Sequence, residues 1–280
     1  MESIKYSEFL GGAFRLPFSS PPRNLFVLTA YVDESGQQQQ QDFMFVAGYV
    51  GDEQAWRRVE AAWPSAIAPR KNLHMKRLRF ERESEREMIV RVAAVSRDCG
   101  LIPIFSGVRQ ADYRDLVEGT EEERRLAGYL ICCFPLIIHT LRNIPKNERL
   151  ELVYGRQDTY WPLADLAVAT IAKVDYYPDI LMEDGRHKLA TWRTAPQGPE
   201  EGLTEIADAF CYALTQAYRD KTSLRAQWCQ PILDAHEGGY GQIFKRDEIR
   251  SLIEDTLMVQ LLGDAKKLWK ARGSGDTLRP

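Results

Sequence analysis

The chain has 280 residues, of which 44% are hydrophobic and 28% are charged, and its formal net charge is -3. This composition is typical of a globular protein that buries a sizeable core. The small negative charge argues against a protein that coats nucleic acid in bulk, although it is compatible with a local basic groove on an acidic surface.

The cysteines and the apolar segments favour a cytoplasmic protein. Five cysteines, an odd number with no C-x-x-C pair, predict reduced and mostly buried thiols. No apolar stretch approaches the ~18 residues that a membrane span needs, and the first residues lack the order of a signal peptide. We therefore expect a cytoplasmic protein without a membrane partner.

The chain opens with an irregular arm and a hairpin. Residues 1–24 contain three prolines and predict an irregular N-terminal arm. Two apolar, β-prone runs at 25–33 and 43–50 are joined by a short polar loop with five glutamines, which predicts an antiparallel hairpin.

After the hairpin, helical and extended patterns alternate. In chain order we expect helices over 53–67 and 82–98, a strand over 101–108, a helix over 120–142, a strand over 149–154, a helix over 160–174, a weaker strand over 187–194, and helices over 199–219 and 246–272.

This alternation predicts an α/β fold in which a mixed sheet opens with an antiparallel hairpin and carries helices on both faces. We expect one domain over 25–220 and a C-terminal helical extension over 221–280, whose last eight residues look disordered.

Two carboxylates end the first strand. Asp33 and Glu34 follow an almost unbroken apolar run, and a carboxylate at the buried end of a central strand is costly unless a positive group meets it. Neighbouring side chains on a strand point to opposite faces, so we expect Asp33 to be the site residue and Glu34 to have a lesser role. The alternative is that both carboxylates solvate a turn before Ser35 and Gly36.

A third carboxylate lies on the helix expected over 199–219. Its apolar stripe includes Leu203, Ile206 and Phe210, and at 100° per residue Asp208 falls on the border of that stripe. Glu205 falls nearly opposite the stripe and is expected to face solvent. Asp208 is therefore a candidate site residue, unless it is a boundary aspartate held by an arginine or by water.

Asp158 lies just beyond the strand expected over 149–154, at the same kind of place as Asp33. It is a candidate for the same site, but it can equally cap the helix that follows.

These residues resemble a known family. Tyr31-Val32-Asp33-Glu34-Ser35-Gly36, the apolar strand after it, Leu73-His74, and Gly202-Leu203-Thr204-Glu205-Ile206-Ala207-Asp208-Ala209 are similar to the DUF3800 family of bacterial proteins. The resemblance covers roughly residues 25–220 and implies a ribonuclease H-like fold with an acidic, metal-dependent site. Two departures are Thr204-Glu205-Ile206, where glutamine is usual before Ala-Asp, and Gly155-Arg156, where an acidic residue is often found.

The resemblance implies that Asp33, Asp208, Asp158 and Glu34 hold Mg²⁺ or Mn²⁺, ions that prefer oxygen ligands. Asp33 would bridge two ions, and His74 or Lys76 would contact phosphate or assist proton transfer, unless His74 is an ordinary exposed loop histidine. The chain would then be a divalent-metal-dependent hydrolase, a nuclease or phosphodiesterase.

The alternative is a non-catalytic ribonuclease H-like module that binds a protein or nucleic-acid partner in a mobile-element or phage-related system. A basic stretch at 266–272 is compatible with nucleic-acid binding, but lysines in a last helical turn more often complement the helix dipole.

Overall fold

The apolar run that follows the N-terminal arm forms a central strand of a mixed sheet. We describe the fold from a computed structural model, which covers residues 27–35, 42–155, 160–173, 178–195, 199–236 and 238–273. The expected arm at 1–24, the glutamine loop, Asp158 and the tail after 273 lie outside these residues.

The sheet has six strands within the described residues, in the order β5-β4-β1-β2-β3-β6. Neighbours β1, β2 and β3 are antiparallel, whereas β4 is parallel to β1, β5 to β4 and β6 to β3. The strands are β1 (Val27–Ser35), β2 (Phe43–Gly51), β3 (Ile102–Arg109), β4 (Arg149–Tyr154), β5 (Leu189–Thr194) and β6 (Tyr240–Phe244).

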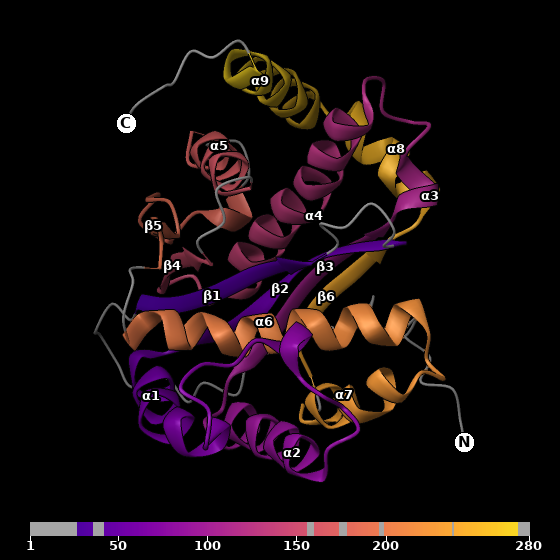
Figure 1. The fold of residues 1–280 in the computed structure, drawn as a ribbon. Helices are drawn as coiled ribbons and strands as arrows, with labels where there is room; N and C mark the ends of the chain where they lie inside the picture. Colours follow the sequence, from indigo (N-terminus) through magenta and orange to yellow (C-terminus); the bar gives the residue numbers. More distant parts are fainter. Residues whose placement is uncertain are drawn as a thin grey trace.

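Helices cover both faces of the sheet and create two apolar cores (Figure 1). One face carries α4 (Glu121–Asn143), α5 (Trp161–Ile171), α8 (Arg246–Glu254) and α9 (Thr256–Gly273). The other carries α1 (Glu53–Ile67), α2 (Glu83–Asp98), α6 (Pro199–Arg219) and α7 (Leu224–Asp234). The short elements are η2 (Met75–Arg77), α3 (Gln110–Tyr113) and η3 (Pro178–Ile180).

Successive side chains of β1 point alternately into the two cores. Ala30 and Val32 lie in the core under α4, and Tyr31 lies in the core under α6. Because successive side chains of a strand point to opposite faces, Asp33 continues the row of Tyr31, and Glu34 continues the row of Val32. The expected α/β architecture, with its opening antiparallel hairpin and helices on both faces, is therefore confirmed.

Helix starts follow the signals in the sequence. The Asp52 carboxylate accepts the backbone N–H of Ala55 at 2.6 Å and caps α1. Thr120 and Glu123 form a capping box at the start of α4. Each satisfies backbone donors that a helix start leaves without a partner within the helix.

The region after residue 220 differs from expectation. The sequence predicted only helices there, but β6 pairs with β3 and extends the sheet, and α7 packs on α6 and α2. β6 was missed because four of its five residues are only half-buried, so the strand lacks a clear alternation of apolar and polar side chains.

Helix α4 is long and apolar enough to cross a membrane by length and composition, and among the described residues it is the one helix that passes this test. In its most apolar window, 83% of the residues are buried inside the protein. A single helix of this kind is weak evidence for a membrane span, because the central helix of a core has the same composition.

Gly48 offers a test of how closely β1 and β2 approach. A Cβ atom at residue 48 would lie 1.9 Å from the carbonyl oxygen of Tyr31, which is backbone and cannot rotate away. We expect Gly48→Ala to lower the free energy of unfolding by about 3 kcal/mol, measured by urea denaturation. The control is Gly263→Ala in α9, where a Cβ meets nothing within 4 Å and alanine should stabilise the helix by about 0.5–1 kcal/mol. Equal stability of the two variants would contradict the packing of β1 against β2.

Candidate functional site

The structure brings Asp33 and Asp208 together. Asp33 lies near the end of β1 and is only 9% exposed, and Asp208 lies on α6, which packs across β1 and β2. The Asp33 side chain lies close enough to act on the Asp208 carboxyl and lowers its pKa. A shared proton or a bridging cation stabilises two neighbouring carboxyl groups, because two bare carboxylates repel each other.

Three other groups surround the Asp208 carboxyl. Burial is the largest effect on it and raises its pKa. The backbone N–H of Met75 and the positive charges of Lys76 and His74 act in the opposite direction, as does the Asp33 side chain. The segment 74–76 therefore supplies both a fixed donor and positive charge to the acidic pair.

Gly155 lies on the other side of Asp33. The N–H of Gly155 donates to the carbonyl oxygen of Val32 at 3.0 Å, where β4 runs parallel to β1. A Cβ at residue 155 would lie 2.9 Å from Oδ1 of Asp33. A larger residue would thus crowd the carboxylate, which gives a steric reason for glycine at a position where the resemblance led us to expect an acidic residue nearby.

Hydroxyl groups connect the end of β1 to α6. The Ser35 and Thr215 hydroxyls are hydrogen-bonded, and Thr215 Oγ1 donates to the carbonyl oxygen of Cys211 at 2.9 Å, so the Ser35 hydroxyl is the donor to Thr215. The Cys211 thiol is buried beside them, and burial together with the charge of Asp33 raises its pKa. These contacts fix Asp33 and Asp208 relative to each other.

Glu205 is not exposed, so the expectation that it faces solvent is wrong. Its side chain is buried and accepts hydrogen bonds from Trp63 Nε1 and from the backbone N–H of Leu73, both at 2.9 Å. The helical wheel assumed one buried face, whereas α6 lies between the sheet on one side and α1 and α7 on the other (Figure 1). Glu205 thereby holds the start of the 73–76 segment over Asp208.

Glu34 lies on the opposite side of the sheet from Asp33. Its charge acts on the pKa of Tyr129, Cys133 and Tyr160, which belong to the core under α4. Burial is the largest effect on Glu34 and raises its pKa well above 4.5, and the neighbouring Asp33 raises it further. Its role as a metal ligand stays a prediction, which this orientation does not favour.

The other predicted site residues are His74 and Asp158. His74 is exposed and precedes η2, close enough for its charge to act on Asp208. Asp158 lies outside the described residues. Among the residues that the structure does describe, no group of three or more His, Cys, Asp or Glu side chains is arranged to hold a metal ion.

The sequence contained a signal for the burial of Glu205 that a prediction from the apolar stripe alone overlooked. Between residues 206 and 215, Asp208 is the only charged residue. A helix that is apolar all round is buried all round, so the polar residues near its start must also find partners inside the protein.

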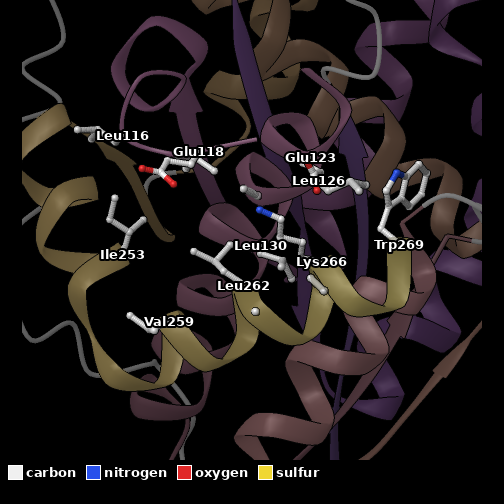
Figure 2. A pocket seen from close by; sticks show the side chains of 14 residues that line it. Leu116, Glu118, Glu123, Leu126, Leu130, Ile253, Val259, Leu262, Lys266 and Trp269 are labelled. Carbon is white, nitrogen blue, oxygen red and sulfur yellow. The ribbon is translucent and has the colours of Figure 1, made fainter. Parts of the chain in front are cut away.

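A pocket of about 470 Å³ lies elsewhere, between the first half of α4 and α9 (Figure 2). Its wall includes Leu126, Leu130, Leu262 and Trp269, and its charged residues are Glu118, Glu123 and Lys266. None of the predicted site residues lines it, and Glu123 already caps α4. The candidate site is therefore the acidic pair beside α6.

Comparisons with known proteins add no relative. No protein-family model matches the chain, and no curated protein matches it.

The anchoring role of Glu205 can be tested by unfolding. Glu205→Ala leaves two buried N–H donors without their acceptor, so we expect a loss of about 3 kcal/mol or more in the free energy of unfolding, measured with urea. Glu60→Ala is the matched control, because Glu60 is exposed on α1 and should change stability by no more than about 0.5 kcal/mol. If the two variants were equally stable, the hydrogen bonds of Glu205 would not be anchors.

The buried Glu34 predicts a pH dependence. Its raised pKa keeps it protonated in the folded state, so above pH 4.5 only the unfolded chain gains the free energy of ionisation. In the presence of chelator, the free energy of unfolding of the wild type should therefore decrease relative to that of Glu34→Gln as the pH rises. The decrease should be about 1.4 kcal/mol per pH unit, up to the folded-state pKa of Glu34. Urea unfolding between pH 4 and 8 measures this difference, with the exposed Glu81→Gln as control. A pH-independent difference would contradict the prediction.

Proposed function

We propose that this chain is a divalent-metal-dependent phosphodiesterase, a nuclease with a ribonuclease H-like fold that works in the cytoplasm. The observation that carries the proposal is the pair formed by Asp33, which is buried, and Asp208, a half-buried carboxyl group whose pKa responds to Asp33. Burial of like charges together costs free energy, and such clusters occur where they serve chemistry.

The fold supports the proposal. The mixed sheet opens with an antiparallel hairpin, its first strand ends in Asp33, and a late helix brings Asp208 to that strand end. This layout of acidic residues is the one implied by the resemblance to DUF3800. The five cysteines are free and buried, as expected for a protein of a reducing compartment.

The donor set fits Mg²⁺ or Mn²⁺. Asp33 and Asp208 offer carboxylate oxygens, which these hard ions prefer, and a divalent cation between them would offset the repulsion of their charges. Asp158 is the predicted third ligand. When bound, the metal would activate water and stabilise the leaving oxygen of a phosphodiester.

The protein's own residues have defined tasks in this proposal. Lys76 provides a positive charge for a phosphate oxygen next to the carboxyl pair. The exposed His74 imidazole would deliver a proton to the leaving oxygen. The N–H of Met75 fixes the Asp208 carboxyl, and Glu205 holds the segment that presents all three groups.

The alternative, a non-catalytic module that binds a protein or nucleic-acid partner, keeps one argument in its favour. Among the described residues, two carboxylates converge but no set of three metal-ligating side chains does. A pair that only stabilises the fold or a partner would bind no metal and cleave no phosphodiester.

Metal binding and cleavage separate the two functions. Mg²⁺ or Mn²⁺ at millimolar concentration should raise the melting temperature of the wild type by mass action on the folded state. Asp33→Asn and Asp208→Asn should each abolish this shift and lower cleavage of labelled DNA and RNA by at least about 100-fold, because each removes a charged ligand. The measurements are thermal unfolding with and without metal, and gel-resolved cleavage of single- and double-stranded substrates.

The control for this experiment is Asp234→Asn. Asp234 is exposed at the end of α7, where its side chain accepts a hydrogen bond from Gln230 that an asparagine oxygen can also accept. It should keep both the metal shift and the cleavage. A wild type whose melting temperature is indifferent to both metals, and which cleaves no substrate, would support the non-catalytic module.

A further inference from the structure

The connection between α1 and α2 is strongly basic. Residues 70–82 contain six lysines and arginines and one glutamate, in a chain whose net charge is -3. Such a concentration of one sign on an otherwise acidic protein creates a local positive potential that attracts polyanions.

The basic side chains of this connection point outward on a fixed backbone. Its apolar residues Leu73, Met75, Leu78 and Phe80 are all buried, which leaves the side chains between them at the surface. The backbone is held by Glu205, which accepts the N–H of Leu73, and by Glu85, which accepts the N–H of Arg79 at 2.8 Å.

Most of these cations are not neutralised by neighbours. Arg70 pairs with Glu85 at 2.5 Å, but for Lys71, Lys76, Arg77, Arg79 and Arg82, all exposed, the described part of the chain offers no ion pair. The charge of Lys76 acts on Asp208, and the other four exposed cations remain available to a ligand.

The basic connection continues along α6 beyond the acidic pair. The Phe80 ring stacks on Tyr212, which lies one turn after Asp208, with ring centroids 6.2 Å apart. The Arg225 guanidinium lies 5.6 Å from the centroid of the same Phe80 ring. Arg219 and Lys221 are also exposed, at the junction of α6 and α7. We call this surface, residues 70–82 with Arg219, Lys221 and Arg225, the basic strip.

We propose that the basic strip binds the phosphate backbone of a nucleic-acid duplex and leads it to Asp33 and Asp208. This inference rests on the proposed function, because it names that site's substrate class. Charge complementarity favours a polyanion, since the exposed cations extend over two connections, 70–82 and 219–225, that approach each other at the Phe80 ring.

The side chains of the strip favour phosphate contacts over base contacts. Single-strand binding without sequence preference uses aromatic side chains on which unpaired bases stack. Phe80, the one aromatic residue of 70–82, is buried against Tyr212. Lysines and arginines that contact phosphates position a duplex without reading its sequence. Binding should therefore be independent of sequence and steeply dependent on salt.

The test measures binding in chelator, where no metal-dependent cleavage occurs. The probes are a fluorescein-labelled DNA duplex of 20 base pairs, the matching RNA duplex and the single strands, followed by anisotropy at several salt concentrations. The test variant is Arg77→Gln combined with Arg79→Gln, two exposed residues outside the acidic pair. The matched control is Lys266→Gln combined with Lys270→Gln, which removes the same charge from α9 on the opposite side of the sheet.

The wild type should bind a duplex more tightly than the single strands. The Arg77/Arg79 variant should reduce the slope of log K against log salt by about 2, and weaken binding about 10-fold or more at ~0.1 M salt, because each arginine releases about one counterion. The Lys266/Lys270 variant should bind as the wild type does. Comparison of the DNA and RNA duplexes shows which of the two is preferred.

Three outcomes of this measurement would overturn the inference: the double arginine variant binds like the wild type, binding is lost in the α9 variant instead, or single strands bind more tightly than the duplex. A fourth would be binding only to vesicles of phosphatidylserine and phosphatidylcholine in equal parts. Asp33→Asn separates this inference from the proposed function. It should bind duplex at least as well as the wild type while losing cleavage. If the strip binds duplex but no metal-dependent cleavage exists, the proposed enzyme fails and the binding surface stands.

Discussion

The position of α6 between two layers is the constraint on which the rest of the site depends. The helix packs on β1 and β2 with one face and on α1 and α7 with the other, so Glu205 is buried and Asp208 is half-buried. A buried carboxylate must find hydrogen-bond donors or positive charge. Glu205 meets this need with Trp63 and the N–H of Leu73, and Asp208 with Asp33, the N–H of Met75 and the charge of Lys76. One helix thus orders both the acidic pair and the connection that crosses it.

Glu34 at the end of β1 and Asp208 on α6 are kept at a cost in stability. Burial raises the pKa of both Glu34 and Asp208, so ionisation of either one destabilises the folded state. A core built for stability alone would hold apolar residues at these positions. Natural proteins keep such costly groups mainly at functional sites, which is why the chemistry we propose is assigned to this strand end and not to the apolar pocket between α4 and α9.

Electrostatics connects the acidic pair to the surface around it. Lys76 and His74 belong to the basic connection at 70–82, and their charges reach Asp208. Glu205 fixes where this connection begins, so a buried hydrogen bond determines where surface cations stand relative to the carboxyl pair. The backbone of the 73–76 segment is preorganised for the function we propose, because hydrogen bonds of the fold hold it before any ligand arrives.

The sequence by itself determined most helices and strands, and it predicted that Asp33 and Asp208 belong to one site. Periodicity, the Asp52 cap and the apolar run before Asp33 predicted the sheet, most helices and the candidate carboxylates, because these signals depend on neighbours along the chain. The tertiary structure alone decided which groups surround them. The burial of Glu205, the donor at Met75, the room left by Gly155 and the strand β6 all depend on segments far apart in sequence. A helical wheel describes a single helix and contains no information about the layers packed on it. For this physical reason it assigned Glu205 to the solvent side wrongly, while it assigned Asp208 to the border of the buried stripe correctly.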